Sequence, residues 1–183
     1  MALATLLAFL PALAAQEGSG DVLRGVVLLK GELPERRSYP APTEREKAAF
    51  PEGIFTDPVD VDRERHVRSA LVYVKAGLEK KAFVPPREPR ILEIENFQLK
   101  PRMIGIMAGQ ELLVTNRDGI LHAIHAHPSA PGNKEFNAGL PARDMSFKAT
   151  FDAPEVALPI RTECLHDWET AWVAVLAHPY YAV

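Results

Sequence analysis

Cysteine is almost absent from this sequence of 183 residues, which contains only Cys164. A chain with one cysteine cannot form an internal disulfide, so its stability must come from a hydrophobic core. Hydrophobic residues make up 47 % of the chain, which supports such a core and argues against disorder. A strong charge is also missing, because the formal net charge is -3 and no long run of Lys or Arg occurs. This balance predicts no nucleic-acid partner.

The sequence has no apolar run long enough to cross a bilayer as a helix. Residues 1–15 (MALATLLAFLPALAA) are uncharged and largely apolar, and small residues precede Gln16. Such a segment is typical of a secretory signal peptide, although the usual Lys or Arg before the apolar run is missing. We therefore expect a periplasmic or secreted protein whose mature chain begins near Gln16 and contains no membrane span.

Short strand patterns, separated by turn signals, dominate the rest of the chain. One short helix is predicted over residues 43–50, where Thr43 and Glu46 have the spacing of a capping box. Residues 128–141 are predicted to be a polar loop. The pattern favours an all-β sandwich or barrel over βαβ units. The predicted strands are residues 22–29, 69–75, 90–95, 103–107, 110–116, 119–126, 145–151, 156–161 and 171–176.

The chain shows no internal repeat and no sharp break in composition. We therefore expect residues 16–183 to form a single domain. A weak seam is expected near residues 85–89, because the Pro-rich segment FVPPREP cannot lie inside a sheet.

The side chains that can bind a metal gather in two short clusters. The first contains His122, His125 and His127, and the second contains Cys164, His166 and Glu169. One upstream His, followed by Cys and His close together, is the ligand order of a mononuclear His2Cys copper site. Since side chains alternate along a strand, His122 and His125 should face opposite sides. Only one of them should be a ligand, with His122 favoured and His125 as the alternative.

Three segments resemble a bacterial exported cupredoxin-like family of plastocyanin type: NRDGILHAIHA, PEVALPIRTECLHDWETAWVAVL and HPYYAV. In that family an Asn-x-Asp turn precedes a Leu-His-Asn-Val-His strand, and a Cys-x-x-His-Pro-Trp-Met loop follows. The resemblance covers residues 22–183 and implies a Greek-key β-sandwich of cupredoxin type with an N-terminal β extension. It also implies one copper ion, a redox partner protein and the ligands His122, Cys164 and His166, with Trp168 as the loop aromatic.

The chain departs from the family pattern in the second cluster. One residue separates Cys164 from His166, where the family has at least two, so the family's cysteine position aligns with Glu163 when counted back from His166. Glu169 stands where the axial Met is expected. A carboxylate is a hard ligand that favours Cu(II), so it predicts a low reduction potential and a site that is not an ordinary blue one. Two further replacements are Ala123 for Asn and Asp167 for Pro.

The leading hypothesis is an exported mononuclear copper protein for electron transfer or copper handling, bound through His122, Cys164, His166 and Glu169. Zinc is the alternative ion, since Cys and His also suit it. A metal-free cupredoxin-like module, acting in an exported protein complex, is the alternative function. We expect no enzymatic activity, because Cys164 is poorly placed for in-line attack beside His166 and no helix N-terminus is evident to activate the thiol.

Overall fold

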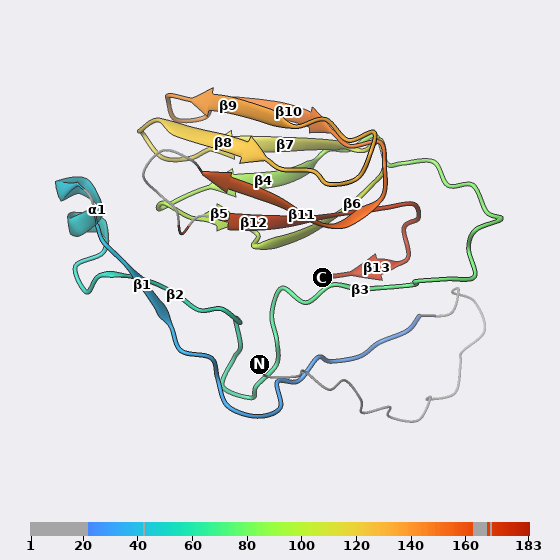
Figure 1. Cartoon of the computed structure of the whole chain (residues 1–183), viewed down its shortest axis with the longest axis horizontal. Coiled ribbons are helices and arrows are strands. Elements are labelled where there is room, and N and C mark those ends of the chain that lie inside the picture. The colour runs from blue at the N-terminus through green and yellow to red at the C-terminus, as the bar shows by residue number, and fades with distance from the viewer. Residues whose placement is uncertain (1–21, 42, 163–167, 169) are drawn as a thin grey trace.

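The computed structural model of the chain describes residues 22–41, 43–162, 168 and 170–183 (Figure 1). In this part of the chain, strands dominate and the helical content is the single helix α1 (Glu44–Ala49). The predicted capping box is present, because Thr43 accepts a hydrogen bond from the Glu46 N–H and the Glu46 carboxylate accepts one from the Thr43 N–H (2.8 Å). The all-β prediction is confirmed. None of the described helices is long and apolar enough to span a membrane.

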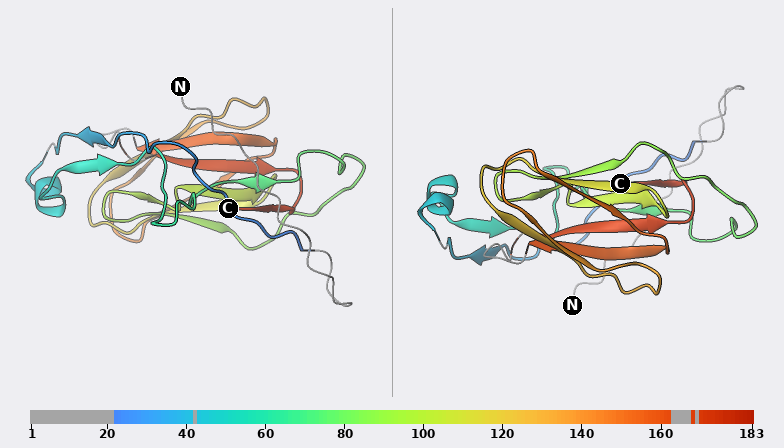
Figure 2. Two further views of the ribbon diagram at one scale, coloured as in Figure 1. Left: turned by 90° about the horizontal axis from the view of Figure 1, so that it is seen from below. Right: turned by 90° about the horizontal axis from the view of Figure 1, so that it is seen from above.

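Two sheets face each other as a sandwich (Figure 2). Two pairings are parallel: β4 (Arg90–Ile94) with β7 (Glu111–Asn116), and β6 (Met103–Met107) with β12 (Thr170–Leu176). The other pairings within the two sheets are antiparallel. Many paired strands are not consecutive in the chain, as in Greek-key connections, so the predicted Greek-key β-sandwich is confirmed. The four-stranded sheet has the order β10 (Ser146–Thr150), β7 (Glu111–Asn116), β4 (Arg90–Ile94) and β5 (Leu99–Lys100). The five-stranded sheet has the order β6 (Met103–Met107), β12 (Thr170–Leu176), β11 (Glu155–Thr162), β8 (His122–Ala126) and β9 (Phe136–Leu140).

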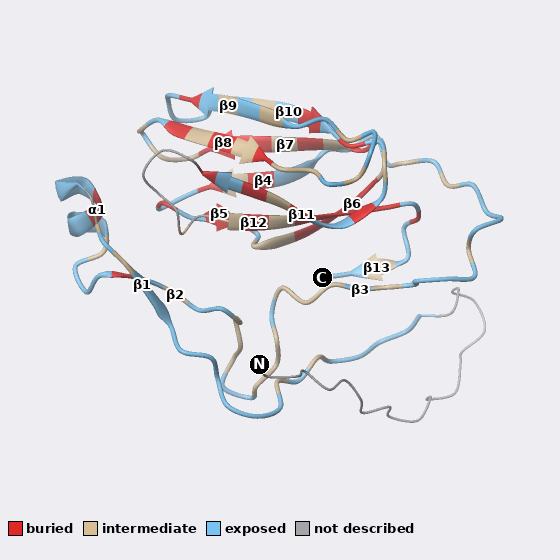
Figure 3. Ribbon diagram, in the orientation of Figure 1, coloured by how far each residue is buried: buried red, intermediate tan, exposed pale blue. Residues whose placement is uncertain are grey.

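The core lies between the two sheets, where alternate side chains of each strand meet (Figure 3). In β8, for example, Ile124 and Ala126 are fully buried, while His125 between them is only partly buried. Other fully buried core residues include Leu92, Ile94, Ile106, Leu112, Val114, Phe151, Leu158, Ile160 and Val173.

The N-terminal region, residues 22–89, adds little to this core. Its two short pairings join β1 (Arg37–Tyr39) to β2 (Ile54–Thr56) and β3 (Val72–Tyr73) to β13 (Tyr181–Ala182). Among its described residues, Glu46 and Ile54 are the buried ones.

Three sequence predictions need correction here. The predicted strand over residues 22–29 is wrong, because this segment forms only a single bridge from Leu28 to His66 and exposes Val22 and Leu23. In the described part of the chain, the apolar side chains of this segment have no neighbouring surface against which they could be buried. The predicted strand over residues 69–75 shortens to β3, and the predicted loop over residues 128–141 contains the edge strand β9.

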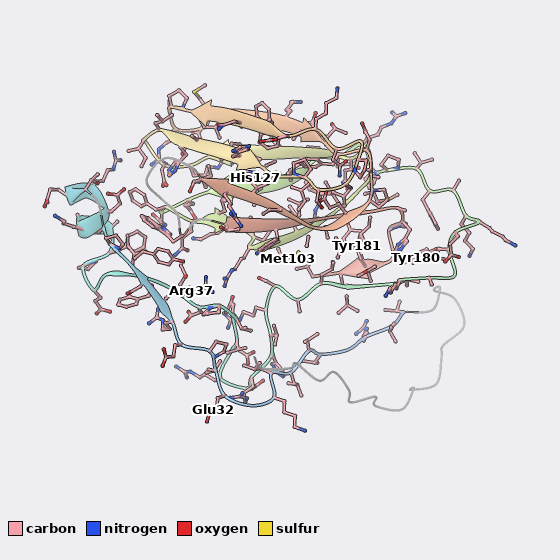
Figure 4. The ribbon with its side chains drawn as sticks, in the orientation of Figure 1. Glu32, Arg37, Met103, His127, Tyr180 and Tyr181 are labelled. Atoms are coloured by element: carbon pink, nitrogen blue, oxygen red, sulfur yellow. The ribbon has the colours of Figure 1, made fainter. Side chains whose placement is uncertain are left out.

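The C-terminal strand β13 covers the outer face of β6. The Tyr181 hydroxyl donates to the Gly105 carbonyl (3.0 Å), and a Cβ atom on Gly105 would lie 2.2 Å from the Tyr181 ring. Figure 4 labels Tyr181 beside β6. Burial raises the pKa of Tyr181. The close approach requires glycine at position 105, so the end of the chain is fixed on the five-stranded sheet.

Candidate metal centre

His122 begins β8 and points into the sandwich with no exposed surface. The predicted alternation is confirmed, since His122 shares the inner face with Ile124 while His125 lies on the outer face with His127. His125 therefore cannot join His122 at one metal ion without a break in the strand. It lies instead beside His127 and Glu135.

The carboxylate of Asp118 fixes the His122 ring. His122 Nε2 lies 3.0 Å from Asp118 Oδ2, and the same carboxylate accepts hydrogen bonds from the N–H groups of Asn96 (2.9 Å) and Phe97 (3.0 Å). A histidine that binds a metal through one ring nitrogen usually donates its other N–H to such a partner. The contact with Asp118 directs Nε2 away from a metal, so Nδ1, which is also shielded from solvent, is the nitrogen that fits one.

Asn116 holds the turn that places Asp118. Its side chain has no exposed surface and donates from Nδ2 to the carbonyls of Ile120 (2.7 Å) and Leu140 (2.8 Å). Its Oδ1 accepts from the Asp118 N–H (2.8 Å). One amide thus connects the end of β7, the turn and the end of β9, so the Asn-x-Asp turn is part of the support for His122.

Arg117 joins the same turn to two other segments. Its guanidinium donates to the carboxylates of Glu93 and Asp144, at 2.7 Å each. These two hydrogen bonds raise the pKa of Arg117. The turn before His122 is therefore attached to β4 on one side and to the loop before β10 on the other.

Two described residues close to the second predicted cluster in sequence, Thr162 and Trp168, lie near His122. β11 ends at Thr162, which pairs with Ile124, two residues from His122. On the other side, Trp168 Nε1 donates to the Phe97 carbonyl (3.0 Å), and the Phe97 ring meets His122 edge-on with 6.2 Å between ring centroids. The predicted ligands Cys164, His166 and Glu169, like Glu163 and Asp167, lie outside the described residues.

Aromatic side chains of the N-terminal region also reach this end of the sandwich. Tyr39 lies 6.1 Å from Trp168, and Phe50 lies 5.8 Å from Phe97, measured between ring centroids. Figure 1 shows α1 and β1 at the end of the sandwich where β8 begins. These contacts could not be predicted from the sequence, because they join residues more than forty positions apart.

When the chain is compared with known proteins, only the comparison with solved structures finds similar proteins. No protein-family model and no curated protein matches this sequence. Among solved structures, a purple cupredoxin from Nitrosopumilus maritimus is similar at 20 % identity, with 47 % of this chain and 98 % of that chain covered and a TM-score of 0.40. An oxidized amicyanin variant is similar at 14 % identity, with 56 % and 90 % covered and a TM-score of 0.41.

A Cu-containing nitrite reductase from Thermus scotoductus is also similar, at 17 % identity and a TM-score of 0.43. That match covers 57 % of this chain but spans only 25 % of the reductase. At these identities and scores the neighbours carry no argument about function. The fold itself rests on the strand pairings, which form a sandwich of two sheets.

Proposed function

We propose that this chain is an exported copper-binding protein that holds one ion at His122 and acts in electron transfer or copper handling rather than as an enzyme. The supporting observation is the His122 imidazole, which is fully buried and fixed by the Asp118 carboxylate. Orientation by a carboxylate is typical of histidines that bind metals.

The chemistry of the donor set fits copper. Imidazole serves both oxidation states of copper, and a rigid support limits the rearrangement between them. Asp118 supplies that support, because two backbone N–H groups hold its carboxylate in place beside His122. Cys164, His166 and Glu169 are the proposed remaining ligands. With Glu169 in place of Met, the bound ion favours the cupric state.

A metal-free binding module is the second candidate. It is supported by the apolar side chains that the N-terminal region leaves in solvent, including Val22, Leu23 and Val26 at 70 %, 90 % and 66 % exposure. Exposed apolar surface of this kind suits a protein partner. On this reading the chain folds fully and does not respond to copper.

Copper content separates the two candidates. The chain and its variants would be loaded with Cu(II), dialysed and assayed for bound copper, visible absorption and electron paramagnetic resonance. We expect one tightly bound copper in the His127→Gln chain, in which binding of an ion on the outer face of β8 is weakened. His122→Gln and His166→Gln, each combined with His127→Gln, should lose it.

The matched control is His178→Gln. His178 is also buried, but its Nε2 lies 2.8 Å from the Val74 carbonyl, in the segment that pairs with the C-terminal strand. Its replacement disturbs the fold without touching the proposed centre, so copper should remain. Unchanged copper in both His122→Gln and His166→Gln would reject the proposal and favour the metal-free module.

A further inference from the structure

The outer face of β8 carries a second group of side chains that can bind a metal. His125 and His127 stack with 3.8 Å between ring centroids and 33° between ring planes. His125 Nε2 is in contact with the carboxylate of Glu135, which precedes β9. One potential ligand atom from each of the three residues lies within 4.8 Å of the others. Figure 4 labels His127 beside β8 and β11.

The loop between His127 and Glu135 is held in place by Glu155. The Glu155 carboxylate accepts hydrogen bonds from the Ser129 N–H and hydroxyl (2.7 Å each), the Ala130 N–H (3.2 Å) and Asn133 Nδ2 (3.1 Å). Burial alone would raise the pKa of Glu155, but these bonds outweigh it and lower the pKa. A charged, buried carboxylate thus organises the loop that connects two members of the group.

The backbone adds to this order at both ends of the loop. The His127 N–H donates to the Pro159 carbonyl of β11 (3.1 Å), and Asn133 exchanges two hydrogen bonds with the backbone of Ala153 (2.8 and 2.9 Å). His127 and Glu135 are therefore placed by the sheet and its loop before any ion is present. Such preorganisation reduces the ordering that binding requires.

We propose that His125, His127 and Glu135 form a second metal site, which binds one borderline divalent cation such as Zn²⁺ or Cu²⁺ on the outer face of the sheet. Two imidazoles and one carboxylate are a ligand set that zinc and copper accept. The position on the sheet surface leaves a fourth coordination position open to solvent. The site is separate from the His122 centre, because it faces the opposite side of β8.

The geometry needs only side-chain adjustment. Donor atoms about 2.1 Å from a tetrahedral ion lie about 3.4 Å from one another. The three ligand atoms already lie within 4.8 Å of one another, so small side-chain shifts would suffice. The Glu135 side chain is 62 % exposed and can rotate toward the two rings. Arg161 pairs with His125 across β11 and brings a positive charge to the same face, but its side chain is exposed and screened by water.

A second group of similar composition provides a matched control. Asp62, Glu64 and His66 also place ligand atoms within 4.8 Å of one another, but they contribute only one imidazole. Asp62 already accepts hydrogen bonds from the N–H groups of Glu64 (2.9 Å) and His66 (3.0 Å), and its carboxylate meets His66 Nδ1 (2.9 Å). This group closes a turn, and we expect no zinc there.

The test is a Zn(II) titration of the full chain, followed by calorimetry and by the histidine-ring signals in NMR. Zinc should shift the rings of His125 and His127. The dissociation constant at this site should rise about tenfold or more in His127→Gln and in Glu135→Gln, because each variant loses a direct ligand and replacement of an outer partner alone costs about that much. His66→Gln should bind like the unchanged chain.

His122→Gln separates this inference from the proposed copper function. Zinc that still binds to the outer site of His122→Gln supports the second site even if copper binding at His122 fails. The inference is overturned if His127→Gln and Glu135→Gln bind zinc as tightly as the unchanged chain, or if the ring signals of His125 and His127 do not respond. Loss of the same zinc in His66→Gln would also overturn it.

Discussion

The two faces of β8 give histidine two different surroundings. On the inner face, His122 has no exposed surface and meets a carboxylate that backbone N–H groups hold in place. On the outer face, His125 and His127 are half-buried and meet the largely exposed Glu135. His122 and His125 are three positions apart, so the alternation of strand side chains places them on opposite faces. An ion bound on the inner face would be shielded from water, whereas an ion bound on the outer face would be open to solvent.

The largest expected effect comes from replacing Asn116, whose hydrogen bonds support the inner face of β8. Asn116→Ala removes three hydrogen bonds and leaves buried backbone groups near Ile120 and Leu140 without their side-chain partner. We expect a loss of about 3 kcal/mol in the free energy of unfolding of the metal-free chain. Urea unfolding followed by circular dichroism measures it.

Asn137→Ala is the control from the outer face. Asn137 is exposed and pairs with His125 across β9, so its replacement should change the free energy of unfolding by about 0.5 kcal/mol or less. Equal losses in the two variants would show that the inner face is not specially supported.

A change at Asp118 should have a smaller effect that falls mainly on metal affinity. Asp118→Asn keeps the shape of the side chain but removes the charge beside His122 Nε2. We expect the copper dissociation constant of the inner site to rise about 10- to 100-fold, as at other sites where a partner of a metal-binding histidine is replaced. Competition with a chelator of known affinity measures the change.

Glu135→Gln is the matched carboxylate-to-amide change on the outer face. It should leave copper affinity at the inner site unchanged while it weakens zinc binding outside. If Asp118→Asn binds copper as tightly as the unchanged chain, the Asp118 carboxylate does not support a copper ligand.

The smallest expected effect concerns pH and the outer loop. The lowered pKa of Glu155 means that its ionised form is favoured in the folded chain. Its contribution to stability is therefore present above the ordinary glutamate value of 4.5 and is lost as the pH falls through the lower pKa of the folded state.

Glu155→Gln tests the direction of this dependence of stability on pH. At pH 7 the variant should be less stable by about 1 kcal/mol, because hydrogen bonds to a charged group become bonds to a neutral amide. The difference from the unchanged chain should shrink below pH 4.5. A difference that stays constant from pH 7 to pH 3 would contradict the role of the ionised carboxylate.

The sandwich was largely predictable from sequence because its strand patterns are short and are separated by turn signals. β8 shows why, since the pattern of HAIHA gave both the strand and the inward direction of His122. The same reasoning failed for residues 22–29, which have apolar side chains but no surface to bury them. It also missed β9, whose sequence FNAGL has weak strand propensity and depends on pairing with β8.

The candidate sites were predictable only where their residues lie close together in the sequence. His122 follows from the strand pattern, and the turn before it carries Asp118 four residues away. Glu135 could not be joined to His125 from the sequence, because the intervening loop is shaped by Glu155 from a distant strand. The expected ligands Cys164, His166 and Glu169 stay predictions, since they lie outside the described residues.

The position of β12 sets the order in which the chain can be completed during synthesis. β12 lies between β6 and β11, and Tyr181 then covers Gly105 on β6. An interior strand of the five-stranded sheet is therefore made by residues that are synthesised after all the other strands of the two sheets. Until they emerge, β6 has no partner on that side and the earlier strands cannot close a stable sandwich. Closure of the sandwich is therefore a late step in the folding of the chain as it is synthesised.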